Sequence, residues 1–196
     1  VQALVYTELQ GNEDGIEMLA ESLMESAMEC GSDPDRAWAL SGDTEVEKLH
    51  AFRHAAAETA NLYIEEQRRK DDRITKLGTD MMVGNLSFGE LLKRYEKEME
   101  EADLRGCIFG HALENHLHVN ILPEDYEAYK KGIVLIRKWA EETVNYHGKI
   151  SGEHGIGKLR RQILGDYISE DYLTFCRKLK VHLDVEDRLN HGNILE

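Results

Sequence analysis

Cysteine, proline and long apolar runs are scarce in this sequence. Its three cysteines, Cys30, Cys107 and Cys176, are odd in number and far apart, which excludes a disulfide framework and a Cys-x-x-Cys metal site. No apolar stretch approaches the roughly 20 residues of a transmembrane helix, and the opening VQALVYTELQG is no signal peptide. We therefore expect a cytoplasmic protein with reduced thiols.

The sequence also lacks positive charge, which argues against nucleic acid as a partner. Lys and Arg total 24 against 38 Asp and Glu, a formal net charge of −14 with histidine neutral. This excess would repel a phosphate backbone unless the basic residues clustered. The 196 residues suit one domain with appended helices and are too few for a two-domain cofactor enzyme.

What is present is a regular alternation of strand and helix patterns. Apolar residues at helical spacing predict helices at 16–27, 43–67, 87–104, 124–147 and 169–184. Short β-rich runs bounded by turn residues predict strands at 3–9, 35–42, 74–84, 106–112 and 116–122. This order predicts an α+β fold, with a ferredoxin-like antiparallel sheet, helices on one face and additional C-terminal helices.

Histidines gather in the segment GHALENHLHVN, which holds His111, His116 and His118. His116 and His118 lie two apart on an expected strand and therefore share a face. His111 and His118 converge only if the chain turns between them, for which 113–115 is suitable. Zn²⁺ or a similar divalent ion takes neutral imidazoles together with a carboxylate. Half-buried strand histidines that only hydrogen-bond to neighbours would show the same spacing.

A second polar segment, SGEHGIG, places Glu153 and His154 between glycines. Gly152, Gly155 and Gly157 indicate a backbone with positive φ or a close approach to a ligand. A plain turn would not need three glycines. The two segments together supply the potential ligands and bases of one site.

Five blocks of sequence occur in an order that carries a resemblance. They are LHAFRHAAAE, ITKLGTDMMV, GHALENHLHVNILP, SGEHGIGKLR and LNHGNILE, and they run over nearly the whole chain. This order resembles the C-terminal half of FAD-linked oxidases of the vanillyl-alcohol oxidase type. The relatives in question are the 2-hydroxy acid dehydrogenases: D-lactate dehydrogenase, the glycolate oxidase flavin subunit and D-2-hydroxyglutarate dehydrogenase. The resemblance implies that residues 1–196 are the substrate-binding cap domain of such an enzyme.

The resemblance assigns roles to the clustered residues. It implies that His111, His118 and Glu153 hold a divalent metal, Zn or Mn, and that His154 is the base. A metal chelated by the hydroxyl and carboxylate of a 2-hydroxy acid lowers the pKa of that hydroxyl. An imidazole that titrates near neutrality can then accept the proton.

Three further residues match positions of the family. Arg53 falls where the family has a carboxylate-binding arginine, whose planar fork suits an acid; the alternative is a surface arginine. Lys76 matches a lysine near the substrate, or else is a strand lysine that points to water. Asn190 matches the asparagine that approaches FAD, although the lysine that follows in the family is replaced by Asn193.

The histidine segment departs from the family pattern. That pattern usually reads Gly-His-Ala-Gly-Asp-Gly-Asn-Leu-His-Val-Asn, and here Leu113, Glu114, Asn115 and His116 replace its middle four residues. His116 stands where the family usually has asparagine. It can be a fourth ligand, a hydrogen-bond partner of the ligands or a sign of different metal content, and we favour the hydrogen-bond partner.

The FAD-binding half of the family precedes this segment. No G-x-G-x-x-G fingerprint occurs in the sequence, so we expect FAD to be bound mainly by an N-terminal half outside this chain. The start at Val1 without Met favours an excised domain. The resemblance implies a 2-hydroxy acid substrate and an electron acceptor, either a quinone, an electron-transfer flavoprotein or an iron–sulfur subunit. Peripheral membrane attachment and a homo-oligomer stay open for the full-length enzyme.

Two other functions compete with this interpretation. A non-catalytic, ferredoxin-like ligand-binding or oligomerisation module would use the histidines only to complete a polar core. It would bind no metal, and 2-hydroxy acids would leave its melting temperature unchanged. A stand-alone metallohydrolase with a zinc-bound water would have the ligands, but the sequence indicates no substrate pocket for it.

Overall fold

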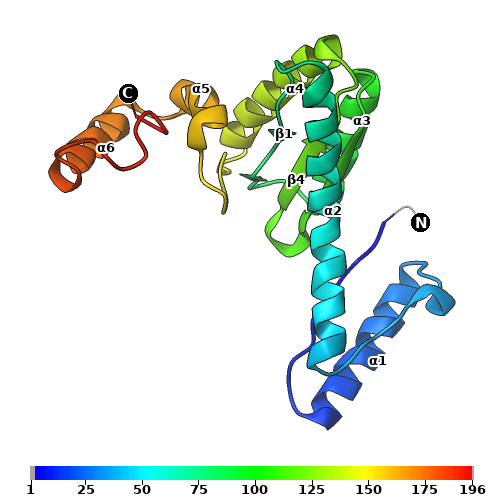
Figure 1. The fold of residues 1–196 in the computed structure, drawn as a ribbon. Coiled ribbons are helices and arrows are strands. Elements are labelled where there is room, and N and C mark those ends of the chain that lie inside the picture. Colours follow the sequence, from blue (N-terminus) through cyan, green and yellow to red (C-terminus); the bar gives the residue numbers. More distant parts are fainter. Residues whose placement is uncertain (1–2, 196) are drawn as a thin grey trace. The chain divides into compact units, whose positions relative to one another are not determined.

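Strand β4 (His116–Ile121) is the centre of a small antiparallel sheet. It pairs along its whole length with β3 (Gly106–His111). On its other side it pairs with β2 (Met81–Met82) and, further along, with β1 (Leu77–Gly78). Figure 1 shows these strands in the computed structural model, which describes residues 3–195 without the side chains of 159 and 162–165.

Helices α3 (Phe88–Glu101) and α4 (Tyr126–Asn145) pack on one face of the sheet. Each begins at a side-chain cap, because Ser87 and Asp125 accept hydrogen bonds from the first-turn backbone N–H groups of Glu90 and Ala128. The apolar residues of both helices recur at three- and four-residue spacing and meet the strands in one core. Its members on these helices and on β4 include Leu91, Tyr95, Ile121, Leu135, Ile136 and Trp139.

The residues of β4 alternate between this core and the opposite face of the sheet. Leu117, Val119 and Ile121 belong to the core, so the residues between them point the other way. His116, His118 and Asn120 are nevertheless 2%, 6% and 5% exposed. Both faces of β4 are therefore covered, one by apolar and one by polar groups.

A tight turn between β3 and β4 produces the register of the histidines. A 3-10 helix, η2 (Ala112–Glu114), leads into Asn115, whose φ of 48° is left-handed. The Asn115 side chain donates a hydrogen bond to the carbonyl of Leu86, which fixes this conformation. The turn predicted at 113–115 is confirmed, and its consequence is that His111 pairs with His116.

The chain divides into two units, which meet between Arg53 and His54 within helix α2 (Asp43–Lys70). The first unit contains α1 (Glu13–Glu29), a 3-10 helix η1 (Pro34–Arg36) and the start of α2. The strands predicted at 3–9 and 35–42 are wrong, because neither segment joins a ladder. Alternating apolar residues make a strand only when another strand offers a pairing edge.

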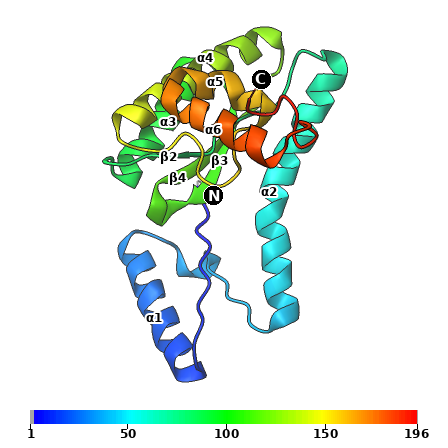
Figure 2. The ribbon, with the colours of Figure 1, turned by 90° about the vertical axis from the view of Figure 1, so that its left-hand side faces the viewer.

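The second unit ends with α5 (Gly157–Tyr167) and α6 (Glu170–Leu183). Helix α5 lies beside α4, as Figure 2 also shows, and the Tyr167 hydroxyl donates to the carbonyl of Arg137 at 3.4 Å. Within the described residues, no helix combines the length and the hydrophobicity needed to span a bilayer. The α+β class with an antiparallel sheet is confirmed, whereas the assignment of 1–196 to one cap domain stays a prediction.

Candidate active site

Three histidines converge on the polar face of the β3–β4 hairpin. The rings of His111 and His116 stack with centroids 5.8 Å apart, and the rings of His116 and His118 meet edge to face at 4.6 Å. His116 and His118 share this face because they lie two apart on β4, as the spacing predicts. His111 joins them because it is opposite His116 across the hairpin.

The SGEHG segment is attached to the free side of β2. Met82 and Lys149 form an antiparallel bridge, and Asp80 and Ser151 form a parallel one. The backbone N–H of Gly152 then donates to the carbonyl of Asp80 at 2.7 Å. These pairings bring Glu153 and His154 over the histidines, although 35 residues separate Glu153 from His118 in sequence.

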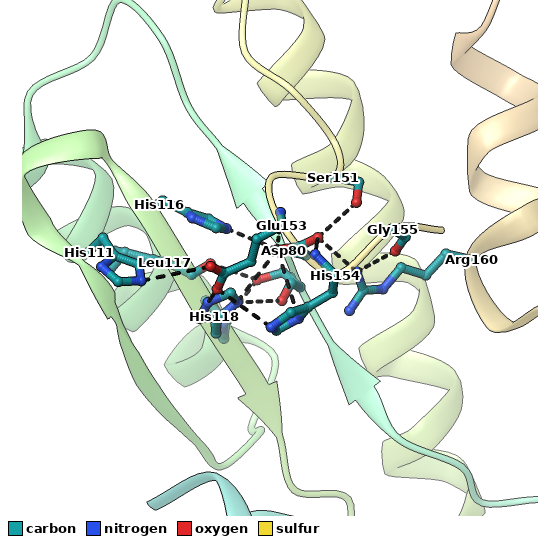
Figure 3. Close-up of polar contacts among 12 residues, drawn as sticks. Asp80, His111, His116, Leu117, His118, Ser151, Glu153, His154, Gly155 and Arg160 are labelled. Carbon is teal, nitrogen blue, oxygen red and sulfur yellow. Dashed lines mark hydrogen bonds and ion pairs between the residues drawn. The ribbon is translucent and has the colours of Figure 1, made fainter. Parts of the chain in front are cut away.

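The carboxylate of Glu153 lies between two of these rings (Figure 3). Its Oε1 is 2.9 Å from Nε2 of His118, and its Oε2 is 3.9 Å from Nε2 of His111. Nδ1 of His118 lies 3.3 Å from the carbonyl of Thr79. Because a carbonyl can only accept, His118 either donates from both ring nitrogens as an imidazolium or, in the neutral tautomer with its hydrogen on Nδ1, presents the Nε2 lone pair to Glu153. Two acceptors that face each other in this way require a proton or a cation between them.

Local electrostatics favour the protonation states that bind a cation. Burial lowers the pKa of His118 and outweighs its hydrogen bonds to Thr79 and Glu153. For Glu153, burial alone would raise the pKa, but the contact with His118, whose protonated ring donates to the carboxylate and attracts it, lowers the pKa below its usual range. A neutral imidazole and an ionised carboxylate are the forms that ligate metals.

His154 lies on the solvent side of this cluster. Its ring stacks on that of His118, with centroids 4.7 Å apart and an interplanar angle of 14°. Its Nε2 is 3.5 Å from Glu153 Oε1, and its Nδ1 is 3.8 Å from Asp80 Oδ1. The side chain is 54% exposed, so a small molecule can reach the ring from solvent.

Asp80 is the residue of this site that the sequence interpretation missed. Its side chain is fully buried, and its carboxylate accepts hydrogen bonds from Ser151, His116 and the backbone of His154. Burial alone would raise the pKa of Asp80, but these hydrogen bonds hold the pKa well below its usual range. The signal in the sequence is a lone acid inside the predicted strand segment ITKLGTDMMV, because an aspartate is seldom buried without partners.

Arg160, at the start of α5, is a second residue that the sequence interpretation missed. Its Nη1 lies 3.4 Å from Asp80 Oδ2 and 3.4 Å from the carbonyl of Gly155. Arg160 therefore links the helix that follows the glycines to the buried acid. No feature of GEHGIGKLR distinguishes this arginine from its neighbour Arg161.

The donor set fits a divalent cation. Asp80, His116, His118 and Glu153 each offer one ligand atom, and these atoms all lie within 4.8 Å of one another. Nitrogen and oxygen donors of this kind suit Zn²⁺ and also Mn²⁺. The predicted set shares His118 and Glu153 with this group, and His111 borders it through Glu153.

The other predicted site residues have different positions. The stem of Lys76 lies over Gly78 next to Asn120, on the sheet face that carries the histidines. Burial and the charge of Arg160 lower the pKa of Lys76. Arg53 is exposed on α2 in the first unit, and Asn190 is exposed in a turn after α6 with a φ of 49°. The substrate role of Arg53 and the flavin role of Asn190 stay predictions.

Fold and site together define an α+β chain with a cluster of imidazoles and carboxylates on one face of its sheet that offers ligand atoms for a metal ion. Over residues 1–194 the chain matches the family model of the FAD linked oxidases, C-terminal domain, and it belongs to this family. The resemblance drawn from the sequence blocks is thereby confirmed.

Curated relatives of the chain are 2-hydroxy acid dehydrogenases by name. It is 30% identical to a D-lactate dehydrogenase of Anaerostipes hadrus over 201 residues, 95% of this chain and 41% of the relative. It is 25% identical to a D-2-hydroxyglutarate dehydrogenase of Xanthomonas citri pv. viticola over 198 residues, 98% of this chain and 39% of the relative. For D-lactate dehydrogenase [cytochrome] 1, mitochondrial, of Saccharomyces cerevisiae, identity is 26% over 136 residues, 68% of this chain and 23% of the relative. The chain spans less than half the length of these relatives.

Proposed function

We propose that this chain is the substrate- and metal-binding part of an FAD-dependent enzyme that oxidises a 2-hydroxy acid to the 2-oxo acid. Its family and the names of its relatives support this class of reaction. The observation that carries the proposal is the 2.9 Å contact between His118 Nε2 and Glu153 Oε1, with the exposed ring of His154 stacked beside it.

His118, Glu153 and His111 are the proposed protein ligands of a divalent metal, Zn or Mn. Thr79 fixes the His118 tautomer through its carbonyl, which is the usual way in which a ligating histidine is oriented. When bound, the metal supplies Lewis acidity that lowers the pKa of the substrate hydroxyl. A site held by three protein ligands would leave the metal open to an oxygen of the substrate.

His154 is the proposed base for the hydroxyl proton. Its two ring nitrogens lie 3.5 Å and 3.8 Å from carboxylate oxygens of Glu153 and Asp80. Once the ring accepts a proton, these negative charges stabilise the resulting imidazolium. Stacking on His118 holds the plane of the ring while its edge stays accessible to the substrate.

The remaining binding roles are assigned to cationic residues and to parts outside this chain. Lys76 is proposed to bind the substrate carboxylate, and Arg53, in the other unit, keeps the carboxylate-binding role that the resemblance implies as a separate proposal. Asn190 is proposed to contact FAD, but the sequence contains no dinucleotide-binding fingerprint. FAD, which accepts the hydride in this reaction class, is therefore proposed to be bound mainly by another part of the enzyme. The electron acceptor is proposed to be a quinone, an electron-transfer flavoprotein or an iron–sulfur subunit.

The test of the base is a comparison of two histidine variants. The chain is joined to the flavin-binding part of its enzyme and assayed with D-lactate, D-2-hydroxyglutarate and an artificial electron acceptor. We expect His154→Ala to lower kcat about 10²–10⁴-fold, the usual contribution of a positioned acid–base group. His182→Ala, an exposed histidine on α6, should retain wild-type turnover. Wild-type turnover in His154→Ala would exclude the assigned role.

Lys76→Gln tests the proposed carboxylate contact in the same assay. Loss of a charge-assisted hydrogen bond should raise KM for the 2-hydroxy acid roughly 10-fold or more. The matched control is Lys93→Gln, an exposed lysine on α3, which should leave KM unchanged. An equal effect of both substitutions would indicate general electrostatic attraction of the acid and no specific contact.

A further inference from the structure

The backbone pairing that holds the 149–154 segment ends at Gly152, just before Glu153 and His154, the proposed ligand and the proposed base. Lys149 pairs with Met82 in both directions, at 2.9 Å and 2.8 Å, and Gly152 N–H donates to the Asp80 carbonyl at 2.7 Å. Beyond Gly152, the backbone N–H groups donate to the side-chain carboxylate of Asp80 and no longer to its backbone carbonyl. It accepts the N–H of Glu153 at 3.3 Å and the N–H of His154 at 2.9 Å.

Asp80 itself is fixed from several directions. Its Oδ2 also accepts from the Ser151 hydroxyl at 2.8 Å and lies 3.4 Å from Nη1 of Arg160. Its Oδ1 accepts from Nε2 of His116 at 2.9 Å. A fully buried carboxylate is costly unless hydrogen bonds replace its hydration. Here three of the donors, the Ser151 hydroxyl and the backbone N–H groups of Glu153 and His154, belong to the segment that carries the proposed ligand and base.

His116 packs directly against the same segment. A Cβ atom added at Gly152 would lie 2.6 Å from both Cε1 and Nε2 of the His116 ring. The segment can therefore approach the sheet this closely only because residue 152 has no side chain. This contact places His116 beneath the turn, where its hydrogen bond orients the Asp80 carboxylate.

We propose that Asp80 is the positioning residue of the site, with His116 as its support, and that it holds the backbone of Glu153 and His154 over His118. The inference rests on the proposed function, since it explains how the proposed ligand and the proposed base are kept 3.5 Å apart. Although Asp80 is one of the four residues that offer a ligand atom, we assign it no place among the ligands, because its Oδ1 already accepts from His116 and its Oδ2 from Ser151 and the backbone of His154.

The experiment measures amide hydrogen exchange and metal binding separately. Exchange is followed over residues 150–156 in EDTA-treated protein, and Zn²⁺ affinity is then measured by calorimetry. The variants are Asp80→Asn, which keeps one acceptor oxygen, Asp80→Ala, which keeps none, and Ser151→Ala. The matched control is Asp72→Asn, because Asp72 is an exposed aspartate just after α2.

We expect exchange at the amides of Glu153 and His154 to rise at least about 10-fold in Asp80→Ala and less in Asp80→Asn. Zn²⁺ affinity should fall about 10–100-fold, the usual effect of removing a partner that orients ligands. Ser151→Ala should give a smaller change in the same direction, and Asp72→Asn should match wild type in both measurements.

Unchanged exchange in metal-free Asp80→Ala would overturn the inference, and weaker Zn²⁺ binding without faster exchange would indicate that Asp80 is a ligand. If the Asp80 variants do not fold, the same exchange measurement is made on Ser151→Ala and His116→Asn. Wild-type exchange over residues 150–156 in both variants would overturn the inference. A wild-type chain that binds neither Zn²⁺ nor Mn²⁺ would remove the metal from the proposed function. Faster exchange in Asp80→Asn would still support the positioning role in that case.

Discussion

The two faces of strand β4 are both buried, yet they are stabilised in opposite ways. On one face Leu117, Val119 and Ile121 pack against the apolar residues of α3 and α4, and burial itself is favourable. On the other face His116 and His118 are buried at a cost that only hydrogen-bond partners offset. The polar face therefore depends on Asp80, Thr79 and Glu153, whereas the apolar face depends on shape and volume.

The two faces also differ in how completely their buried polar groups are hydrogen-bonded. Each buried imidazole has a named partner: Asp80 for His116, and Thr79 together with Glu153 for His118. Among the described residues, the buried side-chain atom without a hydrogen-bond partner is the Tyr95 hydroxyl, in the apolar core. The buried polar groups of the site are thus more completely hydrogen-bonded than those of the apolar core. This is expected where the orientation of side chains matters more than packing.

The largest effect should come from the apolar face. Trp139→Ala removes a ring that is 1% exposed, packs on Tyr95 at 4.6 Å and donates to Glu98 at 2.8 Å. We expect the free energy of unfolding to fall by about 3–5 kcal/mol, as for other buried aromatic residues. Urea unfolding followed by circular dichroism measures it.

His154→Ala is the counterpart on the polar face. Because its side chain is 54% exposed, the free energy of unfolding should change by no more than about 0.5 kcal/mol. Equal losses in the Trp139 and His154 variants would contradict the division of β4 into a stabilising face and a functional face.

The second effect tests how closely the polar face is packed. Gly152→Ala places a Cβ atom 2.6 Å from the His116 ring, which must move, and should cost about 1–3 kcal/mol as an overpacked site. Gly89→Ala, near the start of α3 where nothing lies within 4 Å of the added atom, should be neutral or stabilise by up to about 1 kcal/mol. Both are measured by urea unfolding, and wild-type stability of Gly152→Ala would refute the close approach.

Much of the polar face could be predicted from sequence because it follows from local geometry. The shared face of His116 and His118 follows from their spacing of two. The turn at 113–115 was predicted because His111 and His118 can lie on the same face only if the chain turns between them. Both concern residues close together in the chain. The amphipathic helices 87–104 and 124–147 were predictable for the same reason, and α3 and α4 lie within these ranges.

What could not be predicted depends on partners far away in sequence. Asp80 meets the backbone of His154 across 74 residues, and no local pattern reveals which segment covers a buried acid. The segments 3–9 and 35–42 alternate like strands but have no partner edge, so their pattern was misleading. The ITKLGTDMMV run separates into β1 and β2, with Asp80 between them as the anchor of a different segment.

The smallest expected effect is a pH dependence that belongs to the polar face alone. Burial lowers the pKa of His118 from its ordinary value of 6.5, so the unfolded chain binds a proton there before the folded chain does. The free energy of unfolding should therefore decrease as pH falls through 6.5, and the decrease ends once the folded-state pKa is passed. Glu153 and Asp80, whose pKa values are also lowered, add to this loss only near and below their ordinary values of 4.5 and 3.8. In EDTA-treated protein, His118→Asn should make the decrease between pH 7 and pH 5 smaller, whereas exposed His182→Asn should leave it as in wild type. An unchanged decrease in His118→Asn would show that another group causes it, since a buried neutral imidazole must otherwise contribute in this range.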